Sequence, residues 1–212
     1  DHYTNKKIIH SIIKKYIINN EEFLNEPEKI TKLNSIVLEI KFICLPYSQY
    51  KSISELFKKN NLNITNFFSS SLVKSYKYID FFKENKFIAF LDIGLDRSTM
   101  IFFLNQKLEC LHSIPIGGNH ITKDISQILK INLEKSEQLK CNFDQNLKLS
   151  NDENSSLETL QKIIFARIEE ILELSLKSME SKSYSVDNFK LVLTGEGSKI
   201  LDNQHKDKIS FS

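Results

Sequence analysis

Three glycine-bearing corners are the parts of this sequence whose residue types and spacing could do chemistry. Asp92-Ile93-Gly94 follows an apolar run, Gly117-Gly118 precedes a helix-like segment, and Gly195-Glu196-Gly197 follows another apolar run. Glycine lets the backbone approach an anion closely, and the N–H groups of a turn or a helix N-terminus can then point at it. Together the corners favour a phosphate site, with the first and the last facing one cleft from two sides.

Each corner also has a structural interpretation that needs no ligand. Aspartate and glycine are common in turns between strands, and a glycine often ends a helix or opens a turn. Asp-x-Gly alone, or Gly-x-Gly alone, is therefore weak evidence for a phosphate site. Their order makes the two corners stronger evidence for a phosphate site, because they lie about a hundred residues apart on either side of a glycine pair that opens a helix.

Three consecutive strands would position the first two corners. Apolar runs over 87–91, 99–104 and 108–116 predict strands with tight connections, and Asn105-Gln106-Lys107 is a polar turn. The third strand closes on the glycine pair, and we expect Asn119 to cap the helix that follows.

Helical periodicity follows the glycine pair, and a last strand leads into the third corner. Apolar residues in phase predict helices over 119–130, 133–141 and 157–180. The run FKLVLT at 189–194 predicts a buried strand. Strands therefore mix with helices from residue 85 onward, which indicates an α/β domain.

The stretch 1–84 predicts a small α+β domain. Alternation and apolar bursts indicate strands, while three- and four-residue spacing indicates helices. In chain order we expect one or two short strands in 8–18, a loop at 19–34, a strand at 35–45, a helix at 48–60 with Ser48 as its N-cap, a strand at 62–68 and a helix at 69–84. The boundary would be Lys83-Glu84-Asn85-Lys86.

Composition argues against several classes of function. The formal net charge is only +2, so no general electrostatic attraction to nucleic acid or to an anionic membrane is expected. No apolar run is long enough for a transmembrane helix or a signal peptide. Cys44, Cys110 and Cys141 are widely spaced and lack zinc-site spacing, so we interpret them as reduced structural thiols of a cytosolic protein.

Side chains outside the corners do not predict catalysis. His10, His112 and His120 are scattered in or beside strands or at a helix start, which favours core or capping roles. The acidic residues of the 157–180 helix are most simply its solvated face. No Ser/His/Asp arrangement and no glycosidase-like carboxylate pair is supported by local context. We therefore expect no catalytic residue and no direct metal ligand.

Five segments carry a resemblance to a known family. In order they are LDIGLDRSTM, SIPIGGNHITKDI, LEKSEQLK, IIFARIEEILEL and LVLTGEGSKI. Together they resemble the second half of the bacterial cell-division FtsA family, which lies in the actin, heat-shock-chaperone and sugar-kinase ATPase superfamily. The most specific piece is IPIGGNHIT followed by SEQLK, and the resemblance covers roughly residues 8–200. The chain does not begin with Met and starts in mid-pattern, so we expect a fragment of a longer protein.

The resemblance implies an α/β fold in two parts. An actin-like (RNase H-like) ATPase domain would occupy 85–212, with a short insert at about 131–156 in which 142–156 is a loop or a reduced hairpin. A partial SHS2-like α+β domain would occupy 1–84. The family's first nucleotide-binding subdomain and its C-terminal membrane-binding segment would lie outside this chain.

The resemblance also implies a site for ATP with magnesium. Asp92, Gly94, Ser98 and Thr99 match a phosphate loop that would hold the β- and γ-phosphates, and Gly117 and Gly118 match a glycine pair that would form the cleft floor. Glu137 and Lys140 match a Glu-x-x-Lys pair that would face ribose and adenine, and Gly195 and Gly197 match a last corner that would receive adenosine. Asp92 would orient magnesium-bound water without binding the metal directly. The Glu137–Lys140 spacing is equally that of an ordinary i,i+3 ion pair.

Departures from the family pattern weaken this expected site. Leu95 and Asp96 stand where the family has glycines, and Glu196 replaces a glycine in the last corner. Leu95 adds a Cβ where the backbone must approach phosphate, and Asp96 adds a negative charge that Arg97 would only partly offset. We therefore expect ATP binding to be weak or lost, with turnover slow or absent.

By resemblance the protein is a cell-division adaptor. It would tether the FtsZ ring to the inner face of the cytoplasmic membrane at the division site, recruit later divisome proteins and polymerise in actin fashion. Membrane contact would come only from a C-terminal segment absent from this chain, and no nucleic acid partner is expected. Two alternatives stay open: a PilM-like pilus-assembly adaptor, and an active ATPase or sugar kinase of the same superfamily, against which Leu95-Asp96 argues.

Overall fold

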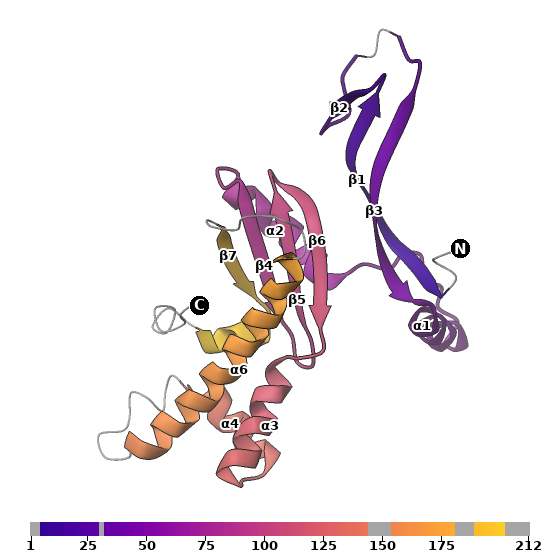
Figure 1. Ribbon diagram of the computed structural model, residues 1–212. Coiled ribbons are helices and arrows are strands. Elements are labelled where there is room, and N and C mark those ends of the chain that lie inside the picture. The colour runs from indigo at the N-terminus through magenta and orange to yellow at the C-terminus, as the bar shows by residue number, and fades with distance from the viewer. Residues whose placement is uncertain (1–4, 30–31, 144–153, 181–188, 202–212) are drawn as a thin grey trace. The chain divides into compact units, whose positions relative to one another are not determined.

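The computed structural model describes residues 5–29, 32–143, 154–180 and 189–201. The chain divides into two compact units, each with its own β-sheet (Figure 1). The first unit comprises Asp1–Lys83 and the hairpin tip Leu104–Glu109, and the second comprises Glu84–Phe103 and Cys110–Ser212. The mixed α/β class expected from the sequence is confirmed.

A three-stranded antiparallel sheet of order β2-β1-β3 forms the first unit. β1 (Lys6–Ile18) pairs with β3 (Ile36–Pro46) along its length, with two register irregularities, so the first predicted segment is one long strand. β2 (Glu21–Phe23) pairs with the end of β1. The predicted loop after β1 is therefore wrong in part. Asn19 and Asn20, with φ of 51° and 71°, turn the chain back sharply enough to form this extra strand.

Helix α1 (Tyr47–Lys59) follows β3 directly and confirms the helix expected at 48–60. Its N-cap is Pro46, with no side-chain cap hydrogen bond, so the expected cap at Ser48 is wrong. The ring of a proline fixes φ near the value that this position needs, and the residue before a helix has no N–H bond to lose.

The chain after α1 is extended but joins neither sheet of the described structure. The strand expected at 62–68 is therefore wrong. Its aromatic side chains pack against rings of α1 and β1 instead, at centroid distances of 5.2 Å between Phe67 and Tyr50 and 5.7 Å between Phe68 and His10. The alternation thus reflects side-chain packing and not strand pairing.

Helix α2 (Ser70–Tyr78) and the 3-10 turn η1 (Ile79–Phe82) form the helix expected at 69–84. Ser69 is the N-cap, and its hydroxyl oxygen accepts a hydrogen bond from the N–H of Leu72. Such a cap satisfies one of the amides that a helix start leaves without an internal partner.

The second unit holds a four-stranded sheet of order β6-β5-β4-β7. β4 (Phe87–Ile93), β5 (Ser98–Leu104) and β6 (Lys107–Ile114) follow one another through short turns, as antiparallel neighbours can. β7 (Lys190–Thr194) pairs with β4 in parallel. All four strands were predicted, and the parallel pair sets the carboxyl ends of β4 and β7 side by side.

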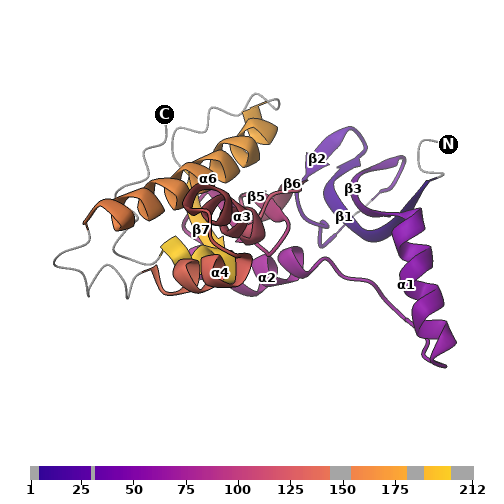
Figure 2. The ribbon, with the colours of Figure 1, turned by 90° about the horizontal axis from the view of Figure 1, so that it is seen from below.

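Helices of the second unit cover the sheet and complete its core. Figure 2 shows α3 (Gly118–Leu129) between α6 (Asn154–Glu180) and α4 (Leu133–Cys141), and the 3-10 turn η2 (Glu196–Leu201) follows β7. Every second residue of β4 shares one buried cluster with α3 and α6. Its members include Ala89, Leu91, Ile93, Ile121, Ile125, Ile164, Ile168 and Ile171.

The helices expected at 119–130, 133–141 and 157–180 are confirmed. The expected cap of the first is wrong, because α3 begins one residue earlier with Gly117 as its N-cap. Most of the loop expected at 142–156 lies outside the described residues.

Of the histidines for which a core or capping role was expected, His10 and His120 have a capping role. His10 Nε2 accepts a hydrogen bond from the Ser69 N–H at the start of α2, and His120 Nδ1 accepts one from the Gly117 N–H at the start of α3. His112 is exposed and lies within β6, so neither a core nor a capping role holds for it.

All three cysteines are free thiols. Cys44 and Cys110 are partly buried, whereas Cys141 is exposed. Among the described residues, no helix combines the length and the apolar character needed to cross a bilayer.

Candidate functional site

The corners after β4 and β7 lie side by side because the two strands run parallel. Thr194 is opposite Asp92 in the ladder, and its hydroxyl donates to Asp92 Oδ1 at 3.2 Å. A Cβ at Gly195 would lie 2.4 Å from the Ile93 carbonyl oxygen and 2.7 Å from Asp92 Oδ1. Gly195 also has a left-handed φ of +89°. Both space and backbone conformation therefore require glycine there.

The turn after β4 is hydrogen-bonded to the N-terminus of α3. Gly94 N–H donates to Arg97 O at 2.9 Å and closes the turn. Gly118 N–H donates to Gly94 O at 2.9 Å, and Asn119 N–H donates to Leu95 O at 2.7 Å. Amides at a helix start are the usual donors to a bound anion. Here these two already have carbonyl partners within the protein.

Gly117 permits this contact between the turn and α3. Its φ of −154° is ordinary extended backbone, so the requirement is one of space. A Cβ at Gly117 would lie 2.5 Å from Gly94 O and 2.7 Å from both Leu95 O and Arg97 N. All three are backbone atoms of the turn, and a side chain at this position would push the turn away from the helix.

The third corner lies close to the second. A Cβ at Gly118 would lie 3.8 Å from Gly197 Cα, 3.7 Å from Lys140 Nζ and 3.7 Å from Gly94 O. A Cβ at Gly197 would lie only 2.4 Å from Ile93 Cγ2. The structure therefore brings together the five glycines of the three corners, with Asp92 on one side and the Lys140 ammonium on another.

The two hydroxyl residues assigned to the phosphate loop are bonded within the sheet. Ser98 Oγ donates to the carbonyl oxygen of Ile116 at 2.7 Å, and Thr99 Oγ1 shares a hydrogen bond of 3.2 Å with Ser113 Oγ. Both side chains are buried. They tie β5 to β6 and to the segment that leads into Gly117.

The Glu-x-x-Lys pair forms an i,i+3 ion pair, with 2.6 Å between Lys140 Nζ and Glu137 Oε2. Lys140 Nζ also donates to Thr122 Oγ1 at 2.8 Å and to Gly118 O at 3.1 Å. Burial alone would raise the pKa of the Glu137 carboxyl. Hydrogen bonds from Lys140 and Thr122 outweigh that effect and hold the pKa below its ordinary value.

The two unusual residues of the turn differ in their surroundings. The Leu95 side chain is 65% exposed, so the apolar group has no core to fill. Asp96 Oδ1 accepts a hydrogen bond from Asn119 Nδ2 at 2.8 Å. The extra negative charge therefore lies at the N-terminus of α3, where the helix dipole favours an anion.

Sequence reasoning missed three residues of this site. Thr194 bonds to Asp92, Asn119 bonds to Asp96 instead of capping α3, and Thr122 joins α3 to the Glu137–Lys140 pair. The spacing offered one signal, because Thr122 lies one helical turn after Gly118 and so shares its face of α3.

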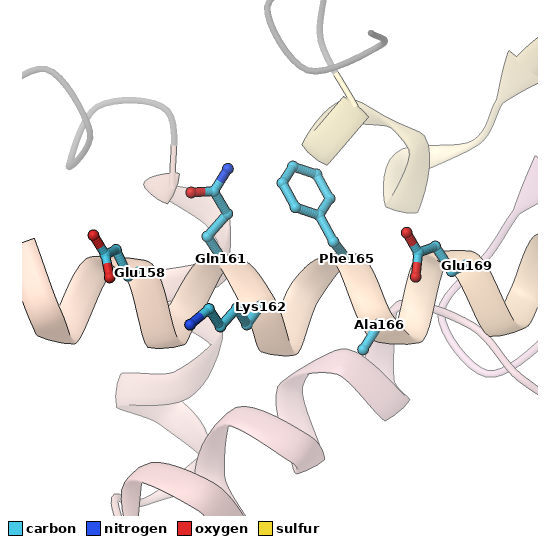
Figure 3. A pocket seen from close by; sticks show the side chains of 6 residues that line it. All are labelled: Glu158, Gln161, Lys162, Phe165, Ala166 and Glu169. Carbon is cyan, nitrogen blue, oxygen red and sulfur yellow. The ribbon is translucent and has the colours of Figure 1, made fainter. Parts of the chain in front are cut away.

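A separate surface hollow of about 380 Å³ lies along α6 (Figure 3). None of the corner residues contributes to it. Among the described residues its lining comes from α6: Glu158, Gln161, Lys162, Phe165, Ala166 and Glu169. The candidate site is therefore the meeting point of the three corners and not this hollow.

Comparison with known proteins decides the family. The family model described as "Cell division protein FtsA" matches residues 89–198, just over half of the chain. The chain belongs to the FtsA family. The matched region begins in β4 and ends in η2, so it contains all three glycine corners.

FtsA relatives match along most of the chain. "Cell division protein FtsA" of Bacillus subtilis (strain 168) is 26% identical over 205 residues, which cover 89% of this chain and 46% of that protein. The FtsA protein of Buchnera aphidicola subsp. Baizongia pistaciae is 23% identical over 217 residues, with 92% and 51% covered. The chain thus spans about half the length of the curated relatives it matches.

Solved structures with a similar fold are actin-like. The "PilM-PilN type IV pilus biogenesis complex" gives a TM-score of 0.62 at 14% identity and covers 82% of this chain and 48% of that one. MreB5 of Spiroplasma citri bound to ADP gives 0.57 at 14% identity, with 73% and 55% covered. Similarity at such identities shows the fold alone. The actin-like architecture expected from the resemblance is confirmed.

Proposed function

We propose that this chain is part of an FtsA-type adaptor of cell division. The full protein would tether the FtsZ ring to the inner face of the cytoplasmic membrane at the division site and would polymerise in actin fashion. The observation that carries this proposal is the family match over 89–198, which coincides with the convergent glycine corners. The membrane contact would come from a segment outside this chain.

The first unit would be the SHS2-like domain that recruits later division proteins. Its antiparallel sheet and the helix α1 have the α+β character that the resemblance implies for 1–84. The second unit would carry the actin-like domain with its short insert at about 131–156, of which α4 is the described part.

A nucleotide site, with ATP and magnesium as its ligand, would lie at the glycine corners. MreB5 of Spiroplasma citri, which shares the fold, has been solved bound to ADP and to AMPPNP, and this supports the ligand class. The residues fit such a ligand only in part. Asp92 lies where the corners meet and would orient magnesium-bound water, although its Oδ1 already accepts a hydrogen bond from Thr194. The corner glycines are filled closely by the protein's own atoms. The Gly118 and Asn119 amides already donate to the turn, and Asp96 opposes an added phosphate.

Binding of the nucleotide would therefore be weak or lost, and the adaptor role would not depend on turnover. An active ATPase or sugar kinase needs backbone donors around the transferred phosphate. Three backbone donors at the corners are engaged within the protein: Gly94 N–H with Arg97 O, Gly118 N–H with Gly94 O and Asn119 N–H with Leu95 O.

Retention of purified FtsZ by the immobilised full-length protein tests the adaptor proposal. PilN serves as the competing partner, because the PilM structure shares the fold. The proposal expects FtsZ to be retained and PilN to pass through. Retention of PilN without FtsZ would replace it by the pilus-assembly alternative, and retention of neither would leave no support for either adaptor.

A further inference from the structure

The turn after β4 supplies three oxygen acceptors to the start of α3. The Gly118 N–H donates to Gly94 O at 2.9 Å, and the Asn119 N–H donates to Leu95 O at 2.7 Å. The side chain of Asn119 makes the third bond, from Nδ2 to Asp96 Oδ1 at 2.8 Å. A helix start offers its amides to the oxygens of a bound phosphate group. Here the turn supplies the oxygens that such a group would bring.

Only one of these three acceptors carries a charge. Gly94 and Leu95 contribute neutral carbonyl oxygens, whereas Asp96 contributes a carboxylate at the positive end of the α3 dipole. A hydrogen bond to a charged group is typically stronger than one between neutral groups. The bond between Asp96 and Asn119 therefore strengthens the hold of the turn on α3, and it is lost if either side chain is removed.

This bond exists because the chain departs from the family pattern. Glycine stands at the position of Asp96 in that pattern, and a glycine has no side chain that could accept a bond from Asn119. Gly117 is the second requirement, since a Cβ there would lie 2.5 Å from Gly94 O and would keep the turn away from α3. The contact thus combines the space left by one glycine with a carboxylate that replaces another.

We propose that Asp96 and Asn119 form an autoinhibitory latch, which holds the turn closed on α3 and keeps the phosphates of ATP from the α3 amides. This inference rests on the nucleotide site proposed above. The carboxylate takes the place of an anionic ligand at the helix start, so the turn stays closed without nucleotide. Charge alone would only repel phosphate. The latch adds a hydrogen bond that phosphate binding has to break, and mutation can separate the two effects.

Two measurements on the full-length protein test the latch. Hydrogen exchange followed by mass spectrometry reports on the Gly118 amide without ligand, and calorimetric titration measures binding of magnesium-ATP. Asn119→Ala removes the latch and leaves the Asp96 charge in place. It should speed exchange at Gly118 and raise the affinity for magnesium-ATP, each by about threefold to tenfold, the usual effect of one hydrogen bond. Asp96→Asn keeps an oxygen acceptor without the charge, so exchange at Gly118 should stay close to the wild-type rate.

Gln127→Ala is the matched control, because Gln127 is exposed on α3 two helical turns after Asn119. It should change neither exchange nor affinity. Asp96→Ala removes both the charge and the latch, so its affinity should exceed that of Asp96→Asn. This comparison is made at an exposed position, and it carries the test if circular dichroism shows that Asn119→Ala does not fold.

The outcomes separate the latch from the nucleotide site. Unchanged exchange at Gly118 in Asn119→Ala would overturn the latch. Unchanged affinity in Asn119→Ala, with equally tight binding by Asp96→Ala and Asp96→Asn, would also overturn it and would leave the nucleotide site with a charge effect alone. No binding of magnesium-ATP at millimolar concentration by the wild type or by any of these variants would overturn the nucleotide site and the latch together.

Discussion

Replacement of Gly117 by alanine should separate the phosphate-loop turn from α3. The added Cβ would have to occupy space 2.5 Å from Gly94 O and 2.7 Å from two further backbone atoms. Backbone cannot rotate out of the way as a flexible side chain can. The turn would therefore have to move away from α3 to relieve the clash, and this would break the hydrogen bonds from Gly118 N–H to Gly94 O and from Asn119 N–H to Leu95 O. Two lost hydrogen bonds at about 1 kcal/mol each and an overpacking strain of about 1–3 kcal/mol predict that the free energy of unfolding falls by about 3–5 kcal/mol.

Gly118→Ala is a matched control one residue away. Its added Cβ would lie 3.7 Å or more from every atom outside its chain neighbours and its own helix backbone, which is ordinary van der Waals contact. We expect a change within about 1 kcal/mol, because Gly118 is buried but the added methyl group meets no clash, and Gly→Ala at a compatible backbone position changes stability by about 0.4–1 kcal/mol. Urea unfolding of both variants, followed by circular dichroism, measures the difference. Equal midpoints for Gly117→Ala and Gly118→Ala would refute the steric reasoning.

Three further predictions concern charged residues. Arg167 donates to both oxygens of Asp124 (2.7 and 2.9 Å) and also bonds to Glu170, so Arg167→Met should lower the free energy of unfolding by about 1–3 kcal/mol in urea, with Arg167→Lys recovering only part. Because the pKa of Glu137 is depressed in the folded state, its stabilisation is present above the unfolded value of about 4.3 and is lost as pH falls through the folded pKa. Glu137→Gln should therefore flatten the acid side of the stability–pH curve, and an unchanged curve would contradict this. Asp96→Gly should raise the affinity for magnesium-ATP by about tenfold in calorimetry, and Asp96→Asn should give most of that gain if charge is the cause.

The strands and helices of the second unit could be predicted because their apolar sequence patterns agree with the faces that the fold buries. The run 87–91 is buried on both faces as a central strand, and such strands are apolar without interruption. The 157–180 helix has one apolar face toward the sheet. Local pattern failed at 62–68, where alternation arises from aromatic packing on α1 and β1 and no neighbouring strand exists in the described structure.

Convergence of the glycine corners could be anticipated from their places at strand ends, but their contacts could not. The close approach of Gly117 to the turn depends on how α3 is set against the sheet. The bond from Asn119 to Asp96 spans 23 positions, and the bonds of Thr122 with Glu137 and Lys140 span the α3–α4 connection. Such long-range hydrogen bonds leave no local periodicity, so the sequence offered only the one-turn spacing of Thr122 from Gly118 as a signal for them.

The central claim is that this chain keeps the actin-like fold while its phosphate-loop turn after β4 binds nucleotide weakly or not at all. Measuring the affinity of the full-length protein for magnesium-ATP tests that claim most directly. Isothermal titration should give binding well weaker than micromolar, or none, since the Gly118 and Asn119 amides are engaged and Asp96 opposes the phosphates. Low-micromolar binding of magnesium-ATP by the wild-type protein would contradict the account.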